Sequence, residues 1–262
     1  MPRVAIAHLT DTHIPGAAEV THQDAEPVRN LRSAIAHASQ RSVGILITGD
    51  CAAKAGTDTE YSAFADLIRE ASVPVWLAPG NHDDSRKMQR LFGLPSRGDR
   101  CDYVVRLTGV NLVVLDSTRT GREDGALDAA QLRWLDEQLG DVPSIVAMHH
   151  PCIPLGGKLY DTIRLDDESR DGLRIVVDSA RRRGARIHAL VSGHAHMTCF
   201  AEFAGAKVII APSTAYEFGL VNGKFSYQLG EAQYMEYSWS ESGGDFLARV
   251  ITVDDSLWRT MR

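Results

Sequence analysis

The chain has 262 residues, of which 44% are hydrophobic and 24% are charged, and its formal net charge is −6. This is the composition of a globular protein, so disordered, collagenous and coiled-coil chains are excluded. The acidic balance argues against a dedicated nucleic-acid surface or a membrane-surface protein, because both favour a basic face. Four cysteines without a CxxC pair indicate neither a disulfide framework nor a structural zinc knuckle.

The sequence contains no apolar run of the ~18 residues that a membrane-spanning helix requires. Its first residues carry no signal-peptide core, so we expect a soluble cytoplasmic protein. The negative net charge does not exclude an anionic substrate, since bound metal ions reverse the sign of the potential inside a pocket.

Short β-branched segments alternate with longer amphipathic segments along most of the chain. The predicted strands are 4–9, 43–48, 73–78, 110–115, 144–148 and 187–192. The predicted helices are roughly 24–40, 57–71, 84–92, 128–139 and 168–183. Thr57 and Glu60 have the form of a capping box at one helix start, and Asp128 and Gln131 repeat it at another.

This alternation predicts an α/β layered domain, but the character of the sequence changes after about residue 197. Segment 198–253 has few helical periods, so we expect mostly strands and loops there. We predict a core over 1–212 and a C-terminal β and loop extension over 213–262, which belongs to the same domain or forms a dimer contact. Its aromatic-rich segment 216–239 suits a sheet core or a subunit interface, and we expect a homo-oligomer, with a dimer favoured.

Polar side chains follow five of the six predicted strands directly. Since ligand sites in α/β sheets lie beyond the carboxyl ends of the strands, these side chains indicate one shared crevice. In chain order the five segments are Thr10-Asp11-Thr12-His13, Gly49-Asp50, Gly80-Asn81-His82-Asp83, His149-His150-Pro151 and Gly193-His194-Ala195-His196.

The residue types in these segments are ligands of divalent metals such as Mn, Fe, Co, Ni and Zn. Too many of them converge for one tetrahedral site, and a carboxylate is able to bridge two ions. Two ions ~3.5–4 Å apart activate a shared water and hold a phosphoryl group. Each segment alone also suits a turn or a helix cap. Together and in this order, the five favour a dinuclear centre.

The five segments resemble the motifs of the calcineurin-like metallophosphoesterases over roughly residues 3–212. Their spacing and the His-His-Pro form at 149–151 are most similar to the bacterial branch that holds class III cyclic nucleotide phosphodiesterases and glycerophosphodiesterases. The resemblance implies a four-layer α/β/β/α sandwich with two metal ions at its rim, of Mn, Fe, Co or Zn.

The resemblance also assigns the metal ligands by position. The implied first site consists of Asp11, His13, Asp50 and His196. The implied second site consists of Asp50, which bridges the two ions, with Asn81, His149 and His194. The phosphate-side acid maps to His82, which with Asn81 is the predicted catalytic pair, and His150 is left beside the ligands.

The activity that the resemblance implies is hydrolysis of a small phosphodiester of the cyclic nucleotide or glycerophosphodiester class by a metal-bridging hydroxide. Two divalent ions, Asp11, Asp50 and the hydroxide carry a net charge of about +1, which suits a singly charged diester. A phosphomonoesterase or nucleotide pyrophosphatase with the same centre is the alternative. A DNA nuclease or a metal-free scaffold protein is disfavoured.

The sequence differs from the motifs of other branches of the superfamily, and these differences favour the phosphodiesterase branch. Cys51-Ala52-Ala53-Lys54 follows the second motif, where protein phosphatases of the superfamily carry an Arg. The pyrophosphatases that act on UDP-sugar lipids have Arg after the Asn, where this chain has His82. We expect substrate contacts in 153–171, because this segment follows the fourth motif without clear periodicity.

Overall fold

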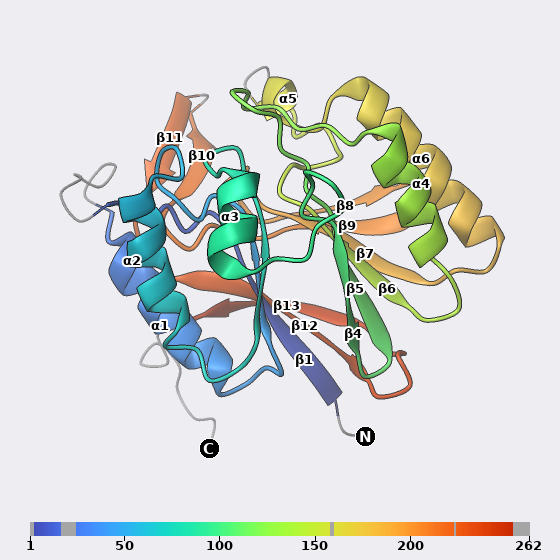
Figure 1. Cartoon of the computed structure of the whole chain (residues 1–262), viewed down its shortest axis with the longest axis horizontal. Coiled ribbons are helices and arrows are strands. Elements are labelled where there is room, and N and C mark those ends of the chain that lie inside the picture. The colour runs from blue at the N-terminus through green and yellow to red at the C-terminus, as the bar shows by residue number, and fades with distance from the viewer. Residues whose placement is uncertain (1–2, 17–24, 158–159, 223, 254–262) are drawn as a thin grey trace.

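The structure is a computed structural model that describes residues 3–16, 25–157, 160–222 and 224–253 (Figure 1). One sheet has the strand order β13-β12-β1-β2-β3, and its strands are β1 (Arg3–Leu9), β2 (Ile45–Thr48), β3 (Val75–Ala78), β12 (Gln233–Ser240) and β13 (Leu247–Thr252). The other has the order β4-β5-β6-β7-β9-β8, and its strands are β4 (Tyr103–Leu107), β5 (Val110–Val114), β6 (Ser144–Ala147), β7 (Ile187–Ser192), β8 (Cys199–Phe203) and β9 (Ala206–Ile210). Strands β10 (Glu217–Val221) and β11 (Lys224–Gln228) form a separate hairpin.

Helices cover the outer face of each sheet (Figure 1). Helices α1 (Pro27–Ser39), α2 (Asp58–Ile68) and α3 (Ser85–Phe92) share a hydrophobic core with the first sheet. Helices α4 (Ala129–Gln138) and α6 (Asp167–Arg182) share one with the second sheet, and the short α5 (Tyr160–Ile163) lies at the end of this layer. A third core fills the space between the two sheets. The α/β/β/α sandwich expected from the sequence is therefore confirmed.

The helix starts follow from local hydrogen bonds that the sequence predicts. The side chain of Thr57 accepts a hydrogen bond from the Glu60 amide, and the Glu60 carboxylate accepts one in return from the Thr57 amide. Asp128 and Gln131 make the same reciprocal pair before α4. Each pair satisfies amide groups that have no partner inside the helix, so the chain turns into a helix at these positions.

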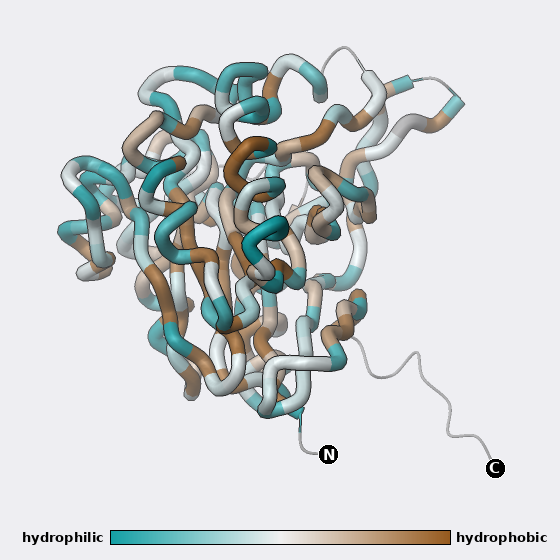
Figure 2. The backbone as a smooth tube through the Cα atoms, turned by 90° about the vertical axis from the view of Figure 1, so that its right-hand side faces the viewer, coloured by the Kyte–Doolittle hydropathy of each residue, from teal (hydrophilic) through white to brown (hydrophobic). Residues whose placement is uncertain are grey.

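The C-terminal strands complete the first sheet, because β12 lies between β1 and β13. Successive β12 residues point alternately to the helix layer and to the second sheet, so that Tyr234 packs with α1 and Tyr237 and Trp239 pack between the sheets. These three rings are fully buried and belong to the sheet core, and the dimer contact expected of segment 216–239 stays a prediction. In Figure 2 hydrophobic stretches follow such interior strands, and hydrophilic stretches mark the outer turns. Phe225 and Tyr227 of β11 are exposed.

Among the described parts of the chain, no helix combines the length and the apolarity needed to cross a membrane.

Candidate metal centre

The five polar segments meet at one rim of the sandwich formed by the two sheets. Strands β1, β2 and β3 run parallel to one another, as do β5, β6 and β7, so the carboxyl ends within each set share one edge. The loops that leave β1, β2, β3, β6 and β7 bring two groups of potential ligands together. The predicted crevice is therefore present, and both sheets contribute to it.

The first cluster consists of Asp11, His13, Asp50 and His196. All four side chains are buried, and one potential ligand atom from each lies within 4.8 Å of the others. The Nε2 atoms of His13 and His196 are 3.0 Å apart. His196 Nε2 also lies 3.5 Å from Asp11 Oδ1, and His13 Nε2 lies 3.7 Å from Asp50 Oδ2. The four ligands that the sequence assigns to one ion are thus placed together.

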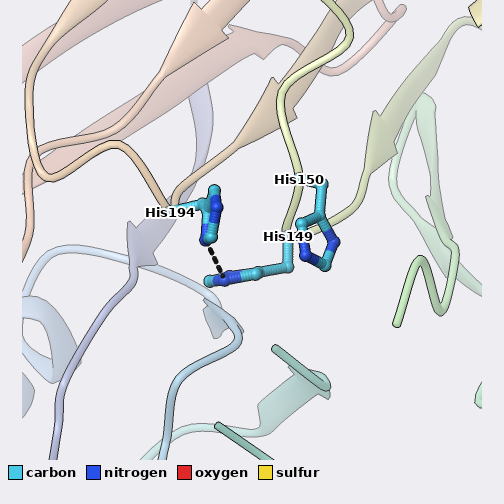
Figure 3. A group of neighbouring side chains, drawn as sticks. All are labelled: His149, His150 and His194. Atoms are coloured by element: carbon cyan, nitrogen blue, oxygen red, sulfur yellow. Dashed lines mark hydrogen bonds between the residues drawn. The ribbon is translucent and has the colours of Figure 1, made fainter. Parts of the chain in front are cut away.

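The second cluster is centred on His149 Nε2. This atom lies 3.0 Å from His194 Nδ1, 3.0 Å from Asn81 Oδ1 and 3.4 Å from Asp50 Oδ1. Figure 3 shows the rings of His149 and His194 pointing toward one another. Because Asp50 reaches both clusters with different oxygen atoms, it occupies the place expected of a bridging ligand.

Figure 3 shows His150 beside this cluster. Its ring is engaged elsewhere. Its Nδ1 is 2.8 Å from Ser117 Oγ and its Nε2 is 3.2 Å from the carbonyl oxygen of Glu123. A ring nitrogen of His150 also lies within 4.8 Å of ligand atoms of His149 and His194, but both of its nitrogens already have protein partners. This geometry agrees with the assignment of His149, rather than His150, as the candidate ligand.

Backbone carbonyls fix the orientation of the imidazoles. His149 Nδ1 is 2.7 Å from the oxygen of Thr48, and His196 Nδ1 is 2.9 Å from the oxygen of Tyr216. A carbonyl only accepts, so both Nδ1 atoms carry the proton, and in the neutral ring Nε2 then carries the lone pair. Each Nε2 therefore directs its lone pair into a cluster, which is the usual arrangement of metal-ligating histidines.

The backbone at the site is unusual. In the described chain eight residues other than glycine have positive φ, and five of these are candidate ligands: Asp11 (51°), His13 (43°), Asp50 (49°), His194 (69°) and His196 (49°). A left-handed conformation costs about 1 kcal/mol or more for a residue with a side chain. Since the surrounding fold maintains this strain at all five positions, the ligand directions are built into the folded chain.

The carboxylates and imidazoles also set one another's ionisation. Burial raises the pKa of Asp11 to about 7, against the attraction of His149. Burial would also raise the pKa of Asp50, but neighbouring imidazoles, led by His149, hold it well below its usual value. Burial likewise lowers the pKa of His149, yet Asp50 and Asp11 together raise it to about 9. The centre thus stabilises a positive charge beside Asp50, and the proton on His149 Nε2 occupies the place that a cation would take.

The turn that carries Asn81 and His82 is anchored by Asp83. The carboxylate of Asp83 accepts hydrogen bonds from the amides of Gly80, Cys51 and Ala52, and so joins the loops after β2 and β3. The amide of His82 donates to Asp50 Oδ1, and its ring Nε2 lies 4.0 Å from Asp50 Oδ2. The His82 side chain is 35% exposed, so it reaches both the clusters and the surface.

Several residues at the site were not predicted from the sequence. Tyr216 packs its ring 4.6 Å from His196 and 5.6 Å from His13. Ser213 Oγ donates to the carbonyl of Asp11. These residues follow strands without any motif around them, so no local pattern distinguishes them from ordinary loop residues.

Segment 153–171 reaches the site from the second sheet, and its residues 158–159 lie outside the described structure. The backbone of Ile163 in α5 faces His194. Burial lowers the pKa of His194 to about 3, and the interaction with the Ile163 backbone opposes this shift. The Tyr160 ring lies 5.7 Å from Phe225 of the hairpin. The segment therefore borders the second cluster, and its role toward substrate stays a prediction.

The calcineurin-like phosphoesterase family model matches residues 4–198, which include every candidate ligand. The chain therefore belongs to the calcineurin-like phosphoesterases. It is similar to a purple acid phosphatase from yellow lupin (Lupinus luteus) seeds, with a TM-score of 0.67 and 13% identity over 96% of this chain and 54% of that one. At this identity the likeness concerns the fold alone, and the chain spans about half of the lupin protein.

Closer relatives are bacterial. The chain is 32% identical to a probable cyclic nucleotide phosphodiesterase of Rhodococcus erythropolis, over 82% of this chain and 72% of the relative. It is 30% identical to a cAMP/cGMP dual specificity phosphodiesterase of Mycobacterium tuberculosis, over 82% and 69% of the two chains. A glycerophosphodiester phosphodiesterase of Enterobacter lignolyticus is 26% identical over 81% and 78%.

Proposed function

We propose that this chain is a dinuclear metal-dependent phosphodiesterase that hydrolyses small diesters of the cyclic nucleotide or glycerophosphodiester class. The names of three relatives support these two substrate classes. The observation that carries the metal requirement is the pair of Nε2 atoms of His13 and His196, which face each other at 3.0 Å.

The two Nε2 atoms cannot hydrogen-bond to each other when both rings carry their proton on Nδ1. The carbonyls of Ala53 and Tyr216 hydrogen-bond the rings of His13 and His196 from the other side. Burial also lowers the pKa of His13 to about 4 and holds that of His196 well below its usual value, so both rings are neutral. Two facing lone pairs beside two carboxylates are complementary to a cation, and imidazole and carboxylate groups suit Mn, Fe, Co or Zn.

We assign Asp11, His13, Asp50 and His196 to one ion, and Asp50, Asn81, His149 and His194 to the other. Two bound ions supply an activated water as nucleophile and withdraw charge from the phosphoryl oxygens. The protein holds the donor atoms in place through carbonyls and strained backbone. Six of the seven proposed ligands, all except Asn81, are buried in the protein.

The substrate side of the centre is formed by Asn81 and His82. The Asn81 amide lies at the second cluster, whereas the His82 ring lies 5.0 Å from the His13 ring and is partly exposed beside the first cluster. His82 Nδ1 makes no hydrogen bond within the described structure. We assign to the His82 ring a hydrogen bond to a phosphoryl oxygen or transfer of a proton to the departing alkoxide.

Three finer features belong to the same proposal. Manganese or iron are the metals we favour, because mixed imidazole and carboxylate donors suit them. A homodimer contact is assigned to the exposed Phe225 and Tyr227 of the hairpin. The four free thiols of the chain suit a reducing compartment, in agreement with a cytoplasmic location.

The test is a comparison of metal-free and manganese-loaded protein on cyclic nucleotides, glycerophosphodiesters, nucleotide pyrophosphates, aryl diesters and the matching monoesters. We expect two metal equivalents per chain and a higher kcat/KM on diesters than on monoesters. Asp50→Asn should lose both ions, Asn81→Ala mainly the second, and Asp141→Asn, an exposed acid elsewhere, neither. Full activity without metal, or a clear monoester preference, contradicts the proposal.

A further inference from the structure

A cavity of about 1020 Å³ opens directly beside Asn81 and His82. Its wall is formed by the first turn of α3, by residues near Arg97 and Arg100, and by the loop that follows Asp116. Apart from Asn81, none of the proposed ligands lines it. A substrate held at the two clusters therefore has its remaining arm next to this cavity.

The cavity wall is almost entirely polar. Of its described residues only Ala55 and Gly121 lack a polar side chain, and His82 carries its one aromatic ring. Pockets that hold flat bases or acyl chains are lined mainly by apolar and aromatic side chains. This wall instead suits a hydrophilic arm.

The acidic residues of the wall are already engaged. Asp83 and Asp116 accept hydrogen bonds from backbone amides. Asp84 and Asp128 cap α3 and α4. Asp99 pairs with Arg86 at 2.7 Å. The carboxylates therefore have their main partners within the protein.

Two arginines of the wall keep free donors. The Arg97 guanidinium lies 5.1 Å from the Trp134 ring, and within the described residues it makes no ion pair and no side-chain hydrogen bond. Arg100 donates one hydrogen bond to the carbonyl of Thr118, and its Nε is 3.9 Å from Asp128. A guanidinium carries five N–H donors, so most of those on Arg97 and Arg100 remain for a ligand.

We propose that Arg97 and Arg100 form a subsite for an oxyanion, a phosphate or a carboxylate, on the substrate arm beyond the reacting phosphodiester. The inference rests on the proposed function and narrows its substrate class to diesters that carry a second anionic group. Guanidinium groups bind such groups with paired, charge-assisted hydrogen bonds. The cation–π contact of Arg97 with the Trp134 ring restricts the movement of its guanidinium.

The test uses three 4-nitrophenyl phosphodiesters that share one leaving group and differ in the other arm: propyl, 3-phosphopropyl and 3-carboxypropyl. We expect manganese-loaded wild type to prefer an anionic arm at least tenfold in kcat/KM, through KM. In Arg97→Gln and Arg100→Gln the preference should fall about tenfold. Arg90→Gln is the matched control, because Arg90 is exposed on α3 and does not line the cavity.

Binding of two product-like ligands gives a readout that needs no turnover. Propane-1,3-bisphosphate should bind wild type at least tenfold tighter than propyl phosphate in calorimetry, and the difference should shrink in both arginine variants. Equal use of the three esters by wild type, or a preference that both variants retain, overturns the subsite. No turnover of any ester refutes the proposed function instead, and the calorimetric comparison then still decides the subsite. The more strongly preferred arm identifies the oxyanion as phosphate or carboxylate.

Discussion

The Nε2 atom of His8 lies 2.6 Å from the hydroxyl of Thr48, in the interior of the first sheet. On its other side, His8 Nδ1 lies 2.8 Å from the hydroxyl of Tyr237. The carbonyl of Thr48 in turn accepts hydrogen bonds from the hydroxyl of Thr10 and from His149 Nδ1. A buried polar row therefore connects β12, through β1 and β2, to a proposed metal ligand.

Removing the far end of this row should weaken metal binding as well as folding. Tyr237→Phe leaves a ring nitrogen of His8 without a partner, which costs about 1–3 kcal/mol. We also expect roughly tenfold weaker binding at the second metal site, because outer partners orient ligating histidines.

The control for this variant is Tyr103→Phe, which removes another buried hydroxyl that bonds to the carbonyl of Leu77. It should lower the melting temperature similarly and leave metal affinity unchanged. Thermal unfolding and manganese titration of both variants are the measurements. Equal metal affinities in the two variants would assign the row a purely structural role.

Gly193 should tolerate no side chain. A Cβ there would meet the Thr10 side chain and would lie 2.6 Å from Asp11 Oδ2. Gly193→Ala must displace Asp11, so we expect loss of metal binding at the first site and a lower melting temperature. Gly140→Ala is the control, since nothing lies within 4 Å of its Cβ position. If Gly193→Ala binds two ions as tightly as wild type, the tight packing at this position is not needed.

His82→Ala tests proton transfer to the leaving group. Positioned proton transfer is worth ~10²–10⁴-fold, and an alkoxide needs the proton far more than a nitrophenolate does. We expect a large loss of kcat on alkyl or ribose diesters, a small loss on aryl diesters and retention of both metals.

Equal losses on the two substrates would favour charge stabilisation by His82 over proton donation. A lower melting temperature with normal turnover per folded molecule would leave His82 a packing role. The two rate constants and the melting temperature together separate these outcomes.

Asp102 should make folding stability depend on pH. Burial raises its pKa from 3.8 to about 6, so between these values the folded chain holds a proton that the unfolded chain has lost. The contribution of Asp102 to the free energy of unfolding therefore falls as the pH rises through this window, by about 3 kcal/mol in total.

Asp102→Asn should remove this dependence, because the amide oxygen still accepts the bonds that Asp116 and Gln131 donate. Relative to wild type, its unfolding free energy should rise by about 2 kcal/mol between pH 4 and pH 7. Denaturant unfolding at several pH values measures this difference. A constant difference across the range would mean that Asp102 stays ionised in the folded chain.

The sequence predicts the parts of this molecule that repeat or that lie close together along the chain. Five of the six described helices, the capping boxes and six of the seven strands before residue 197 follow from periodicity and local hydrogen bonding. The strand-end motifs also predict which residues share the crevice, because parallel strands end at one edge.

Contacts between distant segments could not be predicted in this way. The pairing of Ile6 with Tyr237 joins strands more than 200 residues apart, and no pattern in either strand identifies its partner. The packing of the Tyr216 ring against His196 depends equally on how β9 leads into the hairpin. Strand β4 and helix α5 were not predicted, since β4 lies on a sheet edge and α5 has only four residues.

Both clusters draw side chains from loops of both sheets, although no strand of one sheet pairs with a strand of the other in the described chain. Cations bound there cross-link the two halves of the sandwich at one rim. At the opposite rim the halves meet through weaker links, such as the bond from the Trp239 indole to the carbonyl of Thr108. Bound metal ions therefore determine at which rim the two sheets separate first. Metal loading should slow amide exchange near Leu9 and Ser192 more than near Thr108.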